Sequence, residues 1–245
     1  MSPETFVASH TSRPSPAGVS GFTQLLLLTR REFAIERRAA AWIGSMGLLA
    51  IQEVVILGLG FSFEGASAAK TVYTIGALWL AFLFSGSVGA NRSYALEREG
   101  GAFAGLLMLP VSPALIYIAK VLSGLICLLA SILVMFGVAA ILLHLSIGGS
   151  LVAVLVVFAL ASFGYMSLLA LLGGLISELR GRDALLGIAT LPLAVPLFYV
   201  ATSATRTLAQ GAGMTDVGRE FGMLIAFDTV YFALGLLTFE KMVDA

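Results

Sequence analysis

Residues 114–144, "ALIYIAKVLSGLICLLASILVMFGVAAILLH", form an apolar run that is interrupted by a single charged side chain, that of Lys120. A helix needs about 20 mostly apolar residues to cross a bilayer, because every backbone amide in hydrocarbon must be bonded within its own segment. The whole chain has the same character, since 59% of its residues are hydrophobic and 11% are charged. The sequence therefore predicts an all-α integral membrane protein.

Counted along the whole chain, six stretches are long and apolar enough to span a membrane. They are residues 42–61, 72–90, 114–144, 151–176, 184–203 and 221–239. Residues 21–245 are thus predicted to form one six-span transmembrane domain. Residues 1–20, rich in Ser, Pro and Thr, lack the basic start and apolar core of a signal peptide, and we expect them to form a disordered cytoplasmic tail.

The basic residues predict the orientation, because Lys and Arg are retained on the cytoplasmic side of a membrane. Six spans put both termini on one side. Placing the termini inside leaves Lys70, Arg206 and Arg219 outside, while Lys120 can snorkel to the inner interface. The predicted cytoplasmic set is Arg13, Arg30, Arg31, Arg37, Arg38, Arg92, Arg98, Arg180, Arg182 and Lys241. This asymmetry predicts cytoplasmic termini.

Residues 21–40, "GFTQLLLLTRREFAIERRAA", precede the first predicted span. Phe22, Leu26, Thr29 and Phe33 recur at helical spacing, and arginines crowd the other side. One interpretation is a helix that lies in the inner interface with its basic side toward anionic headgroups. The other is a plain helical extension of the first span, anchored by positive charge.

Two acidic side chains fall at membrane depth, Glu53 in the first predicted span and Asp228 in the sixth. Each is costly there unless it faces the bundle interior, a partner or water. Either residue could line a translocation path or a proton relay. The alternatives are a contact between subunits and a protonated, hydrogen-bonded carboxyl group.

Pro192 and Pro196 lie one helical turn apart in the fifth predicted span. Each proline removes an amide donor and crowds the carbonyl group four residues earlier, so we expect the span to bend or open near its start. The functional interpretation is a hinge or a groove beside the bundle. The other is a static kink, because proline is common in membrane helices.

Residues 91–113 connect the second and third predicted spans on the cytoplasmic side. We expect a short helix to carry Glu97, Arg98 and Glu99, two glycines to allow a sharp reversal, and prolines to start the third span. The result is a short hairpin with a charged tip and an apolar flank. One interpretation is that this hairpin docks a cytoplasmic partner. The other is that it is an ordinary loop in which glycines and prolines end the helices.

Several classes of function lack their motifs in this sequence. None of the three lysines follows a glycine, as the phosphate-binding loop of an ATPase requires. The formal net charge is zero, so no basic excess indicates a nucleic-acid partner. The two histidines lie far apart, and no metal or haem site can be argued from them. The chain is therefore predicted to be neither an ATPase nor another enzyme.

The pattern "EREGG-xxxx-LLMLPVSP-xxxxxx-K" over residues 97–120 resembles the cytoplasmic coupling segment of type-2 ABC exporter permeases. Together with the six spans and "LPLAVPLFYVATSA" at residues 191–204, it resembles the CcmB family of haem exporter permeases in cytochrome c maturation. The resemblance assigns ATPase coupling to Glu97, Arg98, Glu99, Gly100, Gly101, Leu106, Leu107, Pro110, Ser112, Pro113 and Lys120.

The resemblance implies a type-2 ABC permease bundle in the bacterial inner membrane, with no cofactor of its own. ATP would bind to a separate subunit, CcmA, and haem would be held by the partner CcmC, with the small subunit CcmD, or be the substrate. ATP use would release the haem-loaded chaperone CcmE. Two alternatives stay open: a type-2 exporter permease for a lipid, drug or glycan, and a proton- or ion-coupled secondary transporter that uses Glu53 and Asp228.

Overall fold

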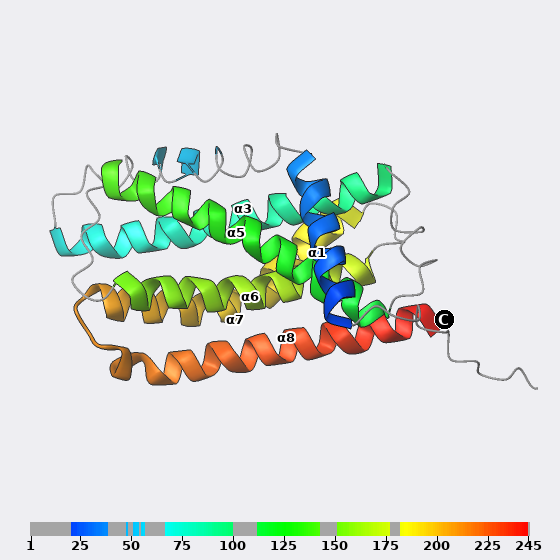
Figure 1. The fold of residues 1–245 in the computed structure, drawn as a ribbon. Helices are drawn as coiled ribbons and strands as arrows, with labels where there is room; N and C mark the ends of the chain where they lie inside the picture. The colour runs from blue at the N-terminus through cyan, green and yellow to red at the C-terminus, as the bar shows by residue number, and fades with distance from the viewer. Residues whose placement is uncertain are drawn as a thin grey trace, which may run out of the picture.

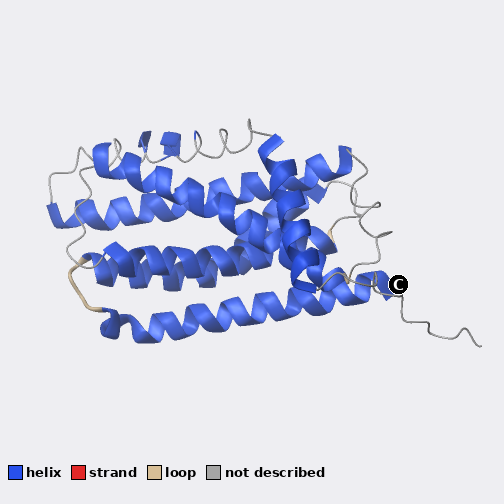
Figure 2. Cartoon of the chain, viewed as in Figure 1, coloured by secondary structure: helices blue, strands red, loops and turns tan. Residues whose placement is uncertain are grey.

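The computed structural model of the chain describes residues 21–38, 48, 51–53, 55–56, 67–99, 112–142, 151–176 and 182–244. All regular elements in these ranges are helices, as predicted (Figure 2). They are α1 (Gly21–Arg38), α3 (Ser67–Glu99), α5 (Pro113–Leu142), α6 (Leu151–Leu175), α7 (Arg182–Ala209), the 3₁₀ turn η1 (Met214–Val217) and α8 (Gly218–Asp244).

Four of the described helices are long and apolar enough to cross a membrane. They contain the stretches Pro113–Ile141, Leu151–Leu175, Leu185–Ala209 and Met214–Lys241, which correspond to the third to sixth predicted spans. The second predicted span falls within α3, where the apolar stretch Thr74–Ala90 lies. Most of the first, residues 42–61, is outside the described residues, as is the predicted tail 1–20. The chain is a multi-pass helical membrane protein.

The helices α3, α5, α6, α7 and α8 run alongside one another, and α1 crosses the bundle near one end (Figure 1). That end, on the right of the view, gathers the end of α3, the start of α5, the end of α6, the start of α7 and the end of α8. Successive helices therefore alternate in direction, which is the arrangement that short connections between spans require.

Helix α6 is the central element and packs against α5, α7 and α8. Of its most apolar stretch, 61% is buried within the chain, against 17% for α8. A single hydrophobic sequence cannot tell these two positions apart, because lipid and protein interior are equally apolar. Only the packing makes α6 the core and leaves most of α8 facing outward.

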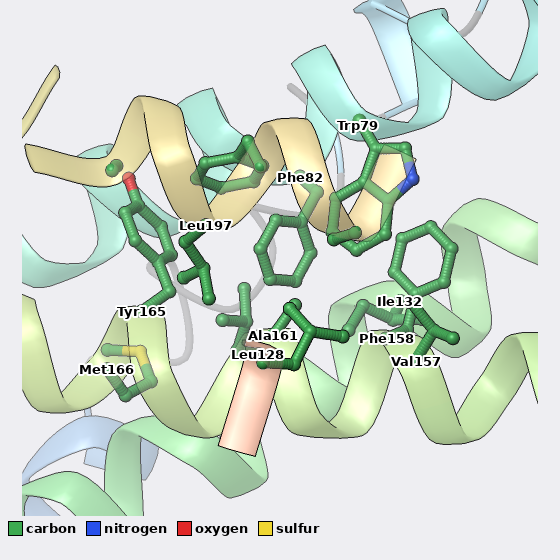
Figure 3. Close-up of a cluster of buried hydrophobic side chains, with 14 of the residues drawn as sticks. Trp79, Phe82, Leu128, Ile132, Val157, Phe158, Ala161, Tyr165, Met166 and Leu197 are labelled. Carbon is green, nitrogen blue, oxygen red and sulfur yellow. The ribbon is translucent and has the colours of Figure 1, made fainter. Parts of the chain in front are cut away.

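An aromatic cluster joins α3, α6 and α7 at the centre of the bundle (Figure 3). The Trp79 ring stacks on Phe158 with a centroid distance of 4.0 Å and an interplanar angle of 5°. Tyr165 donates a hydrogen bond to the Leu83 carbonyl oxygen over 2.9 Å, and its hydroxyl lies 2.6 Å from Ser87 Oγ. The buried hydroxyl group of Tyr165 thus has two partners within the bundle, which offset the cost of removing it from water.

Candidate functional site

The predicted coupling segment connects two helix ends at the same end of the bundle (Figure 1). Helix α3 continues past its apolar stretch to Glu99, so Glu97, Arg98 and Glu99 form its last turn, in agreement with the predicted short helix. Their side-chain contacts are outside the described structure, as is the backbone of residues 100–111. The predicted sites Gly100, Gly101, Leu106, Leu107 and Pro110 therefore lie outside the described residues.

Helix α5 begins at Pro113, one residue before the predicted start of the third span. The Ser112 carbonyl oxygen accepts a hydrogen bond from the Leu115 amide over 3.0 Å and closes the first turn. Proline suits this first helical position, because its missing amide would have no intrahelical partner there. The predicted coupling segment thus includes the first turns of the long helix α5.

Lys120, two turns further along α5, has a buried side chain that points to α1. Its side chain is 7% exposed, and Nζ lies 3.7 Å from Glu32 Oε2 on α1, whose side chain is 5% exposed. Glu32 Oε1 is also 3.4 Å from Arg31 Nη1. The structure therefore joins a predicted coupling residue to an acidic residue that no sequence pattern singled out.

Helix α1 packs against α5 through apolar residues other than those at the helical spacing noted in the sequence. Leu28 is buried against Ile116 and Ala119 of α5, with the partly buried Leu25 and Leu115 beside them. In contrast, Phe22 and Leu26, which belong to the predicted apolar side, are 76% and 58% exposed. Helix α1 therefore has one apolar surface against α5 and a second that is open to its surroundings.

Asp228 points into the bundle from α8, which satisfies the condition that a carboxyl group at membrane depth imposes. It is 5% exposed and lies against the backbone of Gly164 on α6, with Leu197 of α7 beside it. Its Oδ1 atom has no hydrogen-bond partner among the described residues. The carboxyl group is thus held at the junction of three helices.

Glu53, the second acidic candidate, lies in a helical fragment at residues 51–53 and is partly exposed. Its Oε2 atom is buried and has no hydrogen-bond partner in the described part of the chain. Most of the surrounding predicted span is outside the described residues. The unpartnered oxygen atoms of Glu53 and Asp228 do not bond to each other.

The described residues contain no group of three or more His, Cys, Asp or Glu side chains that could hold a metal ion. The free thiol of Cys127 is buried in α5. The buried charged side chains of the described residues are those of Glu32 and Lys120, which form the ion pair between α1 and α5, and that of Asp228.

The sequence matches the model of one protein family, described as CcmB protein, over residues 23–244. The chain belongs to the CcmB family. CcmB proteins are membrane permease subunits of haem exporters in cytochrome c maturation, and the chain is thus a transport component of a Ccm haem exporter complex. No curated protein matches the sequence.

The CcmB match begins at residue 23, within α1, and includes the whole bundle. Helix α1 with Glu32 is therefore part of the family region and not an appendage of the N-terminal tail. The match also contains the complete predicted coupling segment, although part of its backbone is outside the described residues.

The two prolines of the CcmB-like segment lie on the outer surface of α7. Pro192 and Pro196 are exposed, and α7 remains helical through both of them from Arg182 to Ala209, without the opening that the sequence suggests. Beside them, Tyr231 of α8 donates a hydrogen bond to the Leu193 carbonyl oxygen over 2.7 Å. This contact with α8 ties the proline-containing part of α7 to the bundle.

Proposed function

We propose that this chain is the permease subunit through which ATP hydrolysis by a separate subunit, CcmA, drives haem export or delivery for cytochrome c maturation. The observation that carries the proposal is the CcmB match over residues 23–244. The absence of a phosphate-binding loop in the sequence supports an ATPase supplied by another chain. The convergence of the α3 and α5 ends at one end of the bundle supports a docking segment there.

We also propose the six-span topology, with cytoplasmic termini, in the bacterial inner membrane. The alternating directions of the described helices and the distribution of Lys and Arg support it. In this orientation α1 lies across the cytoplasmic end, where its exposed Phe22 and Leu26 enter the lipid interface and its arginines meet headgroups. Residues 1–20 form the cytoplasmic tail and residues 91–113 the coupling hairpin.

The proposed partners supply ATP binding and haem handling, for which this chain has no motif of its own. CcmA binds ATP, CcmC with the small subunit CcmD handles haem, and the release of haem-loaded CcmE is the outcome. The chain itself binds the lipid bilayer and holds no cofactor or nucleic acid. The family favours this function over a lipid, drug or glycan exporter. The buried Asp228 is the one observation that favours ion-coupled transport.

Within the coupling hairpin, Glu97 and Glu99 make polar contacts to CcmA, while Leu106, Leu107 and Pro110 occupy an apolar groove on it. Reversing both charges with Glu97→Lys/Glu99→Lys is expected to lower the recovery of CcmA on the tagged chain about tenfold, because like charges would then face its docking surface. The measurement is co-purification in mild detergent, with mass spectrometry and a haem absorption spectrum.

The control is Glu240→Lys, which reverses an exposed charge on α8 near the same end of the bundle. It should leave CcmA recovery unchanged. Equal recovery with the reversed pair and with the control would rule out the assignment of Glu97 and Glu99. Recovery of an ATPase without haem from the unmodified chain would favour a general exporter.

The exposed surface around Pro192 and Pro196 is proposed to face the haem-handling partner CcmC. Replacing both with Pro192→Ala/Pro196→Ala restores two backbone amides and changes the shape of this surface. We expect recovery of CcmC and of the haem absorbance to fall at least about threefold, with CcmA recovery unchanged. If the double variant retains full CcmC recovery and full cytochrome c yield, the proposal that this surface faces CcmC is wrong.

A further inference from the structure

We propose that the Glu32–Lys120 ion pair fixes α1 to α5, so that the two helices move as one rigid unit when the coupling hairpin is displaced. Glu32 is then a positioning residue for ATP coupling. This inference rests on the proposed function and adds a second helix to the coupling apparatus. It is carried by the contacts between α1 and α5.

The position of Lys120 connects the pair to the hairpin. Lys120 lies seven residues after Pro113 on the same continuous helix, which is roughly 10 Å along its axis. A helix transmits an axial displacement over this length, since its backbone bonds hold each turn to the next. A movement imposed at Ser112 therefore reaches Lys120, and through it Glu32.

The environment of the pair makes it sensitive to the loss of either partner. Both side chains are more than nine-tenths buried, next to the apolar contact of Leu28 with Ile116 and Ala119. Burial weakens the solvent screening of the two charges, so the loss of either charge removes a strong interaction between the two helices. Apolar contacts alone tolerate sliding, whereas a buried ion pair favours one register between two helices.

The second cation beside Glu32 does not replace Lys120. Arg31 is the neighbour of Glu32 on α1 and its side chain is 37% exposed, so its 3.4 Å contact stays within one helix. Lys120 is the cation that crosses from α5 to α1. Helix α1 packs mainly against α5 among the described helices, and nothing as extensive holds it to the rest of the bundle.

The test uses the full chain in its complex with the ATP-binding subunit, in the membranes of its own host. The variants are Glu32→Gln, Lys120→Gln and the exchange Glu32→Lys/Lys120→Glu, with Arg30→Gln as the control at an exposed position of α1. The readout is cytochrome c formed per ATP hydrolysed, normalised to the amount of complex. A purely structural loss lowers the amount of complex and leaves this ratio unchanged.

We expect each single variant to lower the ratio about tenfold while the ATP-binding subunit remains bound, and the exchange to restore it to within about threefold. Single variants that behave like Arg30→Gln would overturn the inference. If the ATP-binding subunit does not co-purify with the unmodified chain, the proposed function itself fails. The two failures are therefore distinguishable.

A second measurement applies even if the charge variants do not accumulate. Leu25→Cys and Leu115→Cys, in a Cys127→Ala background, place thiols at partly buried positions on the two sides of the same contact. Joining them with a short bis-maleimide should preserve the ratio, because α1 and α5 already move together. Loss of cytochrome c formation after cross-linking, with the uncross-linked protein active, would show that the helices must separate and would contradict the proposal.

Discussion

Replacing Gly235 with alanine is expected to lower the free energy of unfolding of the bundle by about 3 kcal/mol. A methyl group at this position of α8 would overlap the ring and hydroxyl group of Tyr117 on α5. Tyr117 is fully buried, and its hydroxyl group lies 3.1 Å from the Ser167 carbonyl oxygen and 3.4 Å from that of Tyr231. The ring therefore cannot move away without losing these contacts.

The measurement is the unfolding temperature of the purified chain in mild detergent, with an expected decrease of several degrees, about 5 °C or more. Gly222→Ala is the matched control, because it lies on the same helix and a methyl group there meets nothing within 4 Å. The double variant Gly235→Ala/Tyr117→Leu should recover part of the loss by removing the ring. If Gly235→Ala and Gly222→Ala unfold at the same temperature, the close approach of α5 and α8 is wrong.

Replacing Gly164 with alanine should destabilise the bundle by a similar amount, about 2–3 kcal/mol. The added methyl group would overlap the Asp228 carboxyl group and would lie 3.4 Å from Leu197 Cδ1. The carboxyl group is buried where α6, α7 and α8 meet, and it must shift to make room for the methyl group. Thermal unfolding again measures the effect, with Gly137→Ala on α5 as the control in open space.

Removing the carboxyl group should reverse this effect, so Gly164→Ala/Asp228→Ala is expected to be more stable than Gly164→Ala alone. The isosteric change Asp228→Asn then separates packing from transport. Under the proposed ATP-driven function, Asp228→Asn should keep cytochrome c yield to within about twofold, because the amide fills the same volume. A folded Asp228→Asn protein that has lost transport would instead favour the proton- or ion-coupled alternative.

The sequence predicted helix type and approximate bounds well, because the length of an apolar run is fixed by the thickness of the membrane. The runs at 151–176 and 184–203 correspond to α6 and the greater part of α7. A helix is longer than its predicted span where polar residues continue it. Helix α8 runs from Gly218 to Asp244, whereas the predicted span is 221–239.

The candidate site was predictable only in part, for the same physical reason. A charged residue in an apolar run is visible in the sequence, which is why Lys120, Asp228 and Glu53 could be selected. Their partners are not visible, since Glu32 is one of several charges in an arginine-rich helix and Gly164 is one of many glycines. Partner choice depends on distances between helices, and hydropathy contains no such information.

The sequence by itself determined the membrane environment, the helical class and the family. These properties follow from the length of apolar runs and from local residue patterns. Only the tertiary structure decided that α6 is central, that Asp228 lies against Gly164, and that Lys120 pairs with Glu32 across α5 and α1. A membrane helix is apolar on the side that faces lipid and on the side that faces its neighbours. Hydropathy therefore does not distinguish the two sides, and helix packing is decided by the shape of the surfaces and by a few buried polar groups.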